Sequence, residues 1–206
     1  MKTKVFWLIS LLLIGFVIGG CSPKARYERK LKHELARGVR YDSLFMGLYL
    51  GMPDKDFYTR CWELNRRGLI RQGTGNTTVE YRTGNDLKYP YIMDFYPKFV
   101  LGKISEMPVR YVYAGWAPWN KELTSDKLQE DVLMWYEEVY GTGFMKVEHP
   151  VRGAAYVKID GNRQISIFKE DELHVWTVFT DMLVINEISD SSQVVNNPID
   201  NIKDLK

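Results

Sequence analysis

One order of elements occurs twice along this chain and constrains its fold more than any single motif does. In each half, a segment with helical spacing of apolar residues precedes three segments that alternate as strands do. The first helix is predicted to begin at Gly51-Met52-Pro53 and the second at Thr124 or Ser125, about 72 residues later. Strands that follow one another through short turns pair antiparallel. The sequence therefore predicts an α+β fold with two helix-strand-strand-strand repeats and an antiparallel sheet.

Both helices are defined by their starts, apolar faces and stops. Pro53 fits a first helical turn, and Asp54 and Asp56 suit the positive end of the helix dipole. The apolar faces are predicted to carry Phe57, Cys61 and Leu64 in the first helix and Leu128, Val132, Trp135 and Val139 in the second. Glycines at 68 and at 141 and 143 provide the stops.

The six strands are expected at 77–82, 87–96 and 99–114, and at 154–159, 162–168 and 173–184. Asp160-Gly161 is a hairpin signal between two of them. Pro108 lies inside the long third segment and cannot donate a ladder hydrogen bond. It therefore predicts an edge position or a bulge there.

The first 21 residues have the order of a secretory signal rather than of a folded element. Lys2 and Lys4 precede an apolar run at 5–18, and small residues stand directly before Cys21. An apolar run of about 14 residues is short for a bilayer span, which needs about 20. Cleavage is therefore favoured over an uncleaved transmembrane anchor.

The small residues before Cys21 resemble the lipobox of bacterial lipoproteins. This resemblance implies that residues 1–20 are a signal helix that is removed, and that Cys21 is acylated, palmitate included, so that the chain is anchored to a membrane. Ser22 stands where an aspartate would signal inner-membrane retention, which implies the outer membrane, with the protein facing the periplasm. The rest of the chain then divides into a lipidated basic tether (21–42), a globular domain (43–190, repeats about 43–115 and 121–188) and a flexible tail (191–206).

Charge separates the tether from the domain. Residues 22–40 carry seven Lys or Arg and two Glu, a formal charge of +5, whereas residues 41–206 carry 19 basic and 24 acidic residues, a formal charge of −5. A basic segment beside a lipid anchor can bind an anionic leaflet as a second attachment signal. A solvated tether is the alternative. An acidic domain disfavours a nucleic-acid partner.

No arrangement of residues predicts catalysis. Once Cys21 carries lipid, Cys61 has no intramolecular partner, and its spacing with Phe57 predicts core packing. The three histidines, His33, His149 and His174, form no pair at metal-ligand spacing, and His174 after Glu170-Asp171-Glu172 is interpreted as a solvated turn. The sequence predicts no cofactor and no metal. A hydrolase would require polar groups that converge in a pocket.

Aromatic residues on or near strands are the candidate binding surface, because Tyr and Trp offer large contact area at a small entropic cost. Core packing is the alternative for those on strands, and stacking on glycans would use the same rings. The predicted binding residues are Trp116, Trp119, Tyr111, Tyr113 and Trp176.

The stretch 48–57, Leu-Tyr-Leu-Gly-Met-Pro-Asp-Lys-Asp-Phe, resembles the helix start of small lipoproteins of outer-membrane assembly. In that family the helix precedes a three-stranded antiparallel sheet, and the doubled order is similar to the tandem fold of the β-lactamase inhibitor protein family. The resemblance implies protein binding rather than catalysis. The expected function is thus a non-enzymatic envelope lipoprotein that binds a protein partner, with a glycan- or lipid-binding module as the alternative.

Overall fold

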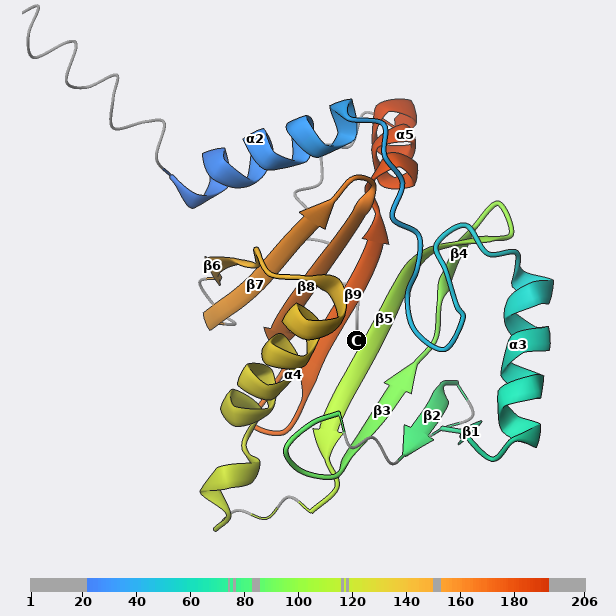
Figure 1. Ribbon diagram of the computed structural model, residues 1–206, viewed down its shortest axis with the longest axis vertical. Coiled ribbons are helices and arrows are strands. Elements are labelled where there is room, and N and C mark those ends of the chain that lie inside the picture. The colour runs from blue at the N-terminus through green and yellow to red at the C-terminus, as the bar shows by residue number, and fades with distance from the viewer. Residues whose placement is uncertain are drawn as a thin grey trace, which may run out of the picture.

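The computed structural model describes residues 22–73, 75, 77–82, 86–115, 117, 119–149 and 153–192. Within them, four α-helices accompany one antiparallel sheet of nine strands, which confirms the predicted α+β class (Figure 1). The signal helix expected at 1–20 and residues 193–206 of the expected tail lie outside this description. No helix in the described part of the chain is long and apolar enough to cross a bilayer.

The helices are α2 (Pro23–Ala36), α3 (Asp54–Arg66), α4 (Ser125–Tyr140) and α5 (Met182–Ser192), with a 3₁₀ turn η3 (Lys121–Leu123) before α4. The strands are β1 (Ile70–Gln72), β2 (Val79–Arg82), β3 (Tyr91–Phe95), β4 (Lys98–Val100), β5 (Lys103–Tyr113), β6 (Met145–His149), β7 (Gly153–Asp160), β8 (Arg163–Lys169) and β9 (Val175–Asp181).

The doubled order is present, with more strands than predicted. The strand order is β1-β2-β3-β5-β9-β8-β7-β6, and β4 pairs only with β5. Each half therefore has one helix followed by four strands of this order, and the last strand of each half lies at the centre of the sheet. The short strands β1 and β6, which directly follow α3 and α4, are the ones the sequence analysis missed. The single strand expected at 99–114 is two strands, β4 and β5, joined by a turn at Leu101-Gly102.

Pro108 lies in the middle of the sheet, so the edge position allowed for it is wrong. Strand β5 lies between β3 and β9, and Pro108 is opposite Val178 of β9. On its other side, the β3 ladder ends at Val109 and the β4 ladder begins at Glu106, which leaves Pro108 between the two. The register shift in the β4 ladder is the irregularity nearby. A residue without an N–H is tolerated in this central strand because the β3 and β4 ladders leave its position unpaired on one side.

The end of the second half also differs from the prediction. The strand expected at 173–184 ends at Asp181, and the chain continues directly into α5. The Asp181 carboxylate accepts a hydrogen bond of 3.1 Å from the backbone N–H of Leu183. This hydrogen bond satisfies a backbone N–H in the first turn of α5 and so favours the start of a helix. The apolar residues at 182–184 had predicted that the strand continues there. Helix α5 extends past residue 191, where the flexible tail was expected to begin.

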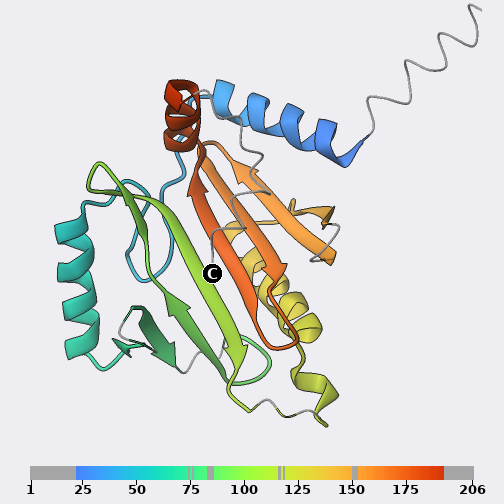
Figure 2. The same cartoon turned by 180° about the vertical axis from the view of Figure 1, so that it is seen from behind.

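The core lies on one face of the sheet. Helix α4 contacts β5, β8 and β9, and viewed from behind the strands lie in front of it (Figure 2). Helix α3 packs at the β1 end. Four buried residues of the segment between α2 and α3 join the same core: Leu44, Leu48, Leu50 and Met52. The Tyr140 hydroxyl of α4 donates to the carbonyl oxygen of Leu44 at 3.0 Å, which fixes that segment to the helix.

The centre of the core is aromatic. Phe179 of β9 is fully buried, and its ring centroid lies 5.4 Å from that of Tyr140, 5.7 Å from that of Tyr136 and 6.0 Å from that of Phe45. It thereby joins a central strand to α4 and to the segment before α3. Ring pairs at these distances stabilise a core beyond the area they bury.

Replacing Phe179 with alanine should therefore lower the free energy of unfolding by about 3–5 kcal/mol, because it leaves a cavity where three ring contacts meet. Urea unfolding measures the change. The control is Met134→Ala on the exposed side of α4, where the side chain is 56% exposed and the loss should stay within about 0.5 kcal/mol. Similar losses in the two variants would contradict this description of the core.

Candidate functional site

The structure does not bring the predicted binding residues together. Tyr111 and Tyr113 are 0% and 3% exposed, so their assignment to a binding surface is wrong. The Tyr111 hydroxyl lies 2.8 Å from that of Tyr136, and the Tyr113 hydroxyl donates to Asp131 at 2.7 Å. Burial raises the pKa of both tyrosines above their ordinary value. Core packing, the alternative weighed for these residues, accounts for both.

The three tryptophans of that prediction have separate surroundings. Trp176 of β9 is half-buried, points away from the face that α4 covers, and has the Arg110 guanidinium 6.0 Å from its ring centroid. Trp119 is 85% exposed in the loop before η3. Trp116 lies outside the described residues. Of the five predicted residues, Trp119 therefore remains a well-exposed candidate.

A different set of large apolar side chains lies on α3 and on the β3–β4 and β4–β5 turns, near the β1 edge of the sheet. We call Tyr58, Trp62, Tyr96, Phe99 and Leu101 the aromatic patch. Tyr58 and Trp62 lie one turn apart on α3 and are 52% and 60% exposed. The Tyr58 hydroxyl is 2.8 Å from the hydroxyl of Tyr96, and the Phe99 ring lies 6.4 Å from the Tyr58 ring and 6.5 Å from the Tyr96 ring. Contacts among the rings of Tyr58, Tyr96 and Phe99 thus join α3 to the β3–β4 turn, and Trp62 lies one turn further along the same helix.

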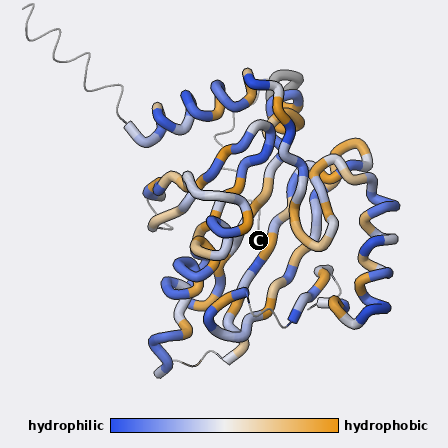
Figure 3. The backbone as a smooth tube through the Cα atoms, viewed as in Figure 1, coloured by the Kyte–Doolittle hydropathy of each residue, from blue (hydrophilic) through white to orange (hydrophobic). Residues whose placement is uncertain are grey.

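Leu101 extends the patch at the tip of the β4–β5 turn, and it is 98% exposed. Its φ of 50° is followed by a φ of 73° at Gly102, so both turn residues are left-handed. A hydrogen bond of 3.0 Å from the Asp54 N–H to the Gly102 carbonyl oxygen holds this turn against the start of α3. Figure 3 shows the hydrophobic turn beside the helix. A leucine in this conformation costs about 1 kcal/mol and buries almost nothing, which points to a role outside folding.

The sequence contains a signal for part of this patch, beside the residues predicted to bind. Tyr58 and Trp62 are spaced i, i+4 beside the predicted buried face of α3, so they form a second aromatic face on one helix. The contributions of Tyr96 and Leu101 depend on how the β3–β4 and β4–β5 turns return to that helix. Such a return depends on contacts distant in sequence, which residue spacing does not encode.

Two chemically capable groups are already engaged within the fold. Burial raises the pKa of the Cys61 thiol to about 11, so it remains protonated and a poor nucleophile. Glu170, Asp171 and His174 place ligand atoms within 4.8 Å of one another. However, Asp171 accepts from the backbone N–H groups of Leu173 and His174, and Glu170 accepts from Arg110. Both arrangements are explained by the local structure.

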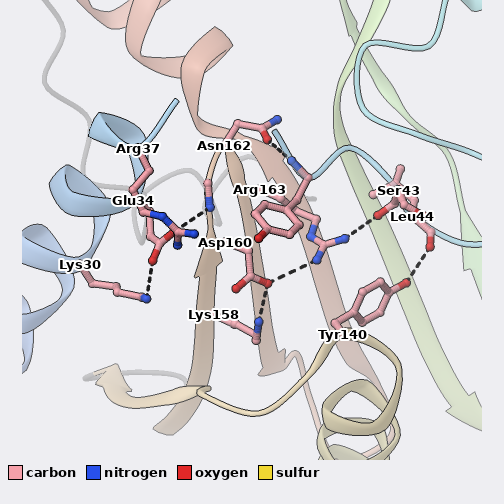
Figure 4. Close-up of polar contacts among 12 residues, drawn as sticks. Lys30, Glu34, Arg37, Ser43, Leu44, Tyr140, Lys158, Asp160, Asn162 and Arg163 are labelled. Carbon is pink, nitrogen blue, oxygen red and sulfur yellow. Dashed lines mark hydrogen bonds and ion pairs between the residues drawn. The ribbon is translucent and has the colours of Figure 1, made fainter. Parts of the chain in front are cut away.

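In the basic segment, Tyr27, Leu31 and Leu35 at a spacing of four predict a lightly docked helix that ends at Gly38. The structure has this helix and fixes it to the domain. Helix α2 starts with Ser22 as its N-cap, whose hydroxyl accepts from the Ala25 N–H at 3.1 Å. The Glu34 side chain, 3% exposed, accepts from the Gly161 N–H at 3.1 Å in the β7–β8 turn and bonds Lys30 at 2.6 Å and Arg37 at 2.9 Å (Figure 4). One buried carboxylate therefore joins α2 to the turn predicted at Asp160-Gly161.

The chain after α2 is held by the same turn. The Asn162 side chain accepts from the Tyr41 N–H at 2.7 Å and donates to Asp42 at 2.9 Å. The Arg163 guanidinium, in a residue 5% exposed, donates to the Ser43 carbonyl oxygen at 2.7 Å and lies 4.9 Å from the Tyr140 ring centroid (Figure 4). These contacts join the β7–β8 turn to the chain after α2, so we assign them to positioning the N-terminal segment.

Comparison with protein-family profiles, with curated proteins and with solved structures found no match to this chain. The aromatic patch and the basic helix α2 are therefore interpreted from their own geometry and chemistry.

Gly161 should be irreplaceable in the β7–β8 turn. Its φ is +52°, and a Cβ there would lie 2.0 Å from the Val39 carbonyl oxygen. Gly102 is the matched control, because its φ is +73° in another strand turn and a Cβ would meet nothing within 4 Å. Gly161→Ala should lose at least about 1 kcal/mol more unfolding free energy than Gly102→Ala in urea titrations, and α2 should become more sensitive to trypsin. Equal losses would show that the contact with Val39 does not hold this segment.

The Glu34 contact should depend on pH. Burial acts to raise the pKa of this carboxyl, but hydrogen bonds from Lys30 and the Gly161 N–H and the charges of Lys30 and Arg37 outweigh it. The pKa falls from 4.5 to about 2. Its contribution to stability is therefore complete above about pH 4.5 and is lost as pH falls through about 2. The Gly161 amide resonance in NMR should shift with a midpoint near pH 2, and Glu34→Gln should abolish that transition. A midpoint near 4.5 would contradict the contact.

Proposed function

We propose that this chain is a non-enzymatic lipoprotein of the bacterial cell envelope that binds a protein partner through the aromatic patch. In this proposal Cys21 carries the lipid, and the domain faces the periplasm from the outer membrane. The observation that carries the binding proposal is Leu101, a fully exposed leucine in a left-handed turn that is hydrogen-bonded to the start of α3, the helix that carries the exposed Tyr58 and Trp62.

The composition of the patch supports a protein partner. Exposed Tyr and Trp beside an aliphatic residue form the kind of surface whose burial dominates protein interfaces. The Arg66 guanidinium lies 4.8 Å from the Trp62 ring centroid and adds a charged group at the border of the apolar residues. A glycan would stack on the rings, but Leu101 offers no ring for stacking. The leucine therefore favours protein over glycan.

The lipid anchor is supported by the order of residues 1–21 and by the start of α2. Its N-cap, Ser22, directly follows Cys21, so folded structure begins one residue after the proposed lipid. The domain would then be held close to the membrane surface and would bind its partner through the aromatic patch.

The binding proposal is tested by crosslinking and affinity capture from detergent-solubilised envelopes. The wild type should capture one protein in an amount close to its own. The variant Leu101→Asn/Trp62→Ala should capture at least about tenfold less of that protein, because central apolar residues carry most of the binding energy of an interface. Asparagine tolerates the left-handed conformation better than leucine, so Leu101→Asn alone should leave the free energy of unfolding unchanged or higher. A loss of capture without a loss of stability separates binding from folding.

Two further variants complete the capture experiment. Met134→Ala changes an exposed apolar residue on α4 and should capture the partner as the wild type does. Trp119→Ala tests the loop predicted from the sequence. Loss of the partner in Trp119→Ala but not in the patch variant would move the site to that loop. Retention on peptidoglycan with no captured protein would support the glycan alternative instead.

A further inference from the structure

We propose that the outer face of α2 binds the surface of an anionic lipid bilayer, with the helix lying along that surface. This inference rests on the proposed lipid anchor for its setting, and it adds a second attachment that fixes how the domain is oriented. The two faces of α2, its attachment to the domain and the charge of the rest of the chain support this orientation.

The two faces of α2 differ in chemistry. Tyr27, Leu31 and Glu34 lie on the inner face, where Tyr27 donates to the Gln164 side chain of β8 at 2.6 Å. The opposite face carries three exposed Lys or Arg side chains, Arg26, Arg29 and Lys32, together with His33, and the exposed Glu28 lies at its edge one turn before Lys32. Residues spaced by three and four share a helix face, so this row runs along most of the helix. A basic face of this kind is attracted to anionic lipid headgroups.

The helix cannot turn this face away from the membrane independently of the domain. Glu34 binds the Gly161 N–H, and Tyr27 binds Gln164 about two helical turns away, so α2 is fixed at two points to the β7–β8 hairpin. A helix of 14 residues is about 21 Å long. If it lies flat on the bilayer, the domain is held above it by the hairpin.

Charge outside α2 favours the same orientation. Residues 41–206 have a formal charge of −5, from 19 basic and 24 acidic residues, so an anionic surface repels the domain while it attracts α2. Helix α3, which carries Tyr58 and Trp62 of the aromatic patch, lies at the β1 edge of the sheet, whereas α2 contacts β7 near the other edge (Figure 1). Membrane binding through α2 would therefore leave the patch accessible to a partner.

The test uses the full chain reconstituted in vesicles, with Ala36→Cys on the outer face of α2 carrying a fluorophore in a Cys61→Ala background. Spin-labelled lipids quench the fluorophore when the helix lies on the bilayer. We expect strong quenching in vesicles of phosphatidylcholine with phosphatidylglycerol, weak quenching in phosphatidylcholine alone, and loss of quenching at high salt. A label at Met134→Cys on α4 should remain unquenched in both.

The charge variant Arg26→Glu/Lys32→Glu should reduce the ratio of docked to undocked protein by at least about tenfold. Lys55→Glu/Lys121→Glu is the matched control, because it changes the net charge equally at exposed positions outside α2 and should dock as the wild type does. Equal quenching in neutral and anionic vesicles, or unchanged quenching in the α2 variant, would overturn the proposal.

Mass spectrometry of Cys21 separates this inference from the proposed anchor. If Cys21 is unmodified, the anchor proposal fails, and the same quenching experiment is run in a Cys21→Ser background, where the apolar run at 5–18 holds the chain on the vesicle. Charge-dependent quenching in that background would still support the α2 surface, and its absence would overturn it. Acylated Cys21 without charge-dependent quenching would overturn the α2 surface and leave the anchor in place.

Discussion

The structure depends on the pairing of β5 with β9. Each is the last strand of its half, and the antiparallel ladder between them, from Glu106 to Tyr111 on β5, joins the five strands of the first half and the four of the second into one sheet. Only a continuous sheet offers one face on which α4 and the segment before α3 can share a core. Phe179 illustrates this, because it belongs to β9 but contacts Phe45, which precedes the first half's helix. The halves therefore cannot bury their apolar residues independently.

Local sequence patterns predicted much of this architecture. Helix α3 begins and ends where Pro53, Asp54 and Gly68 indicated, and the hairpin at Asp160-Gly161 is present. Such features depend on capping, turn chemistry and residue spacing, which act over a few residues. The position of Pro108 in a central strand was not predictable in the same way. It depends on β3 and β4 leaving a gap opposite that residue.

The candidate surfaces were less predictable than the fold. Tyr111 and Tyr113 alternate along β5 as surface or core residues would, and only the placement of α4 decides that they are buried. The N-terminal segment was recognised as basic, but its attachment depends on Glu34 meeting the backbone of Gly161, 127 residues away in sequence. Composition gives the charge of such a segment. It does not give the one buried carboxylate that converts a tether into a fixed helix.

If the chain is exported as proposed, the half-buried thiol of Cys61 has a consequence for it. A chain that enters an oxidising compartment with one unpaired cysteine can be trapped as a mixed disulfide or as a covalent dimer. With a pKa of about 11, only about one thiol in ten thousand is a thiolate at neutral pH. Exchange with other disulfides needs the thiolate, so the folded domain is protected kinetically. The core packing of α3 thus serves as redox protection that requires no second cysteine.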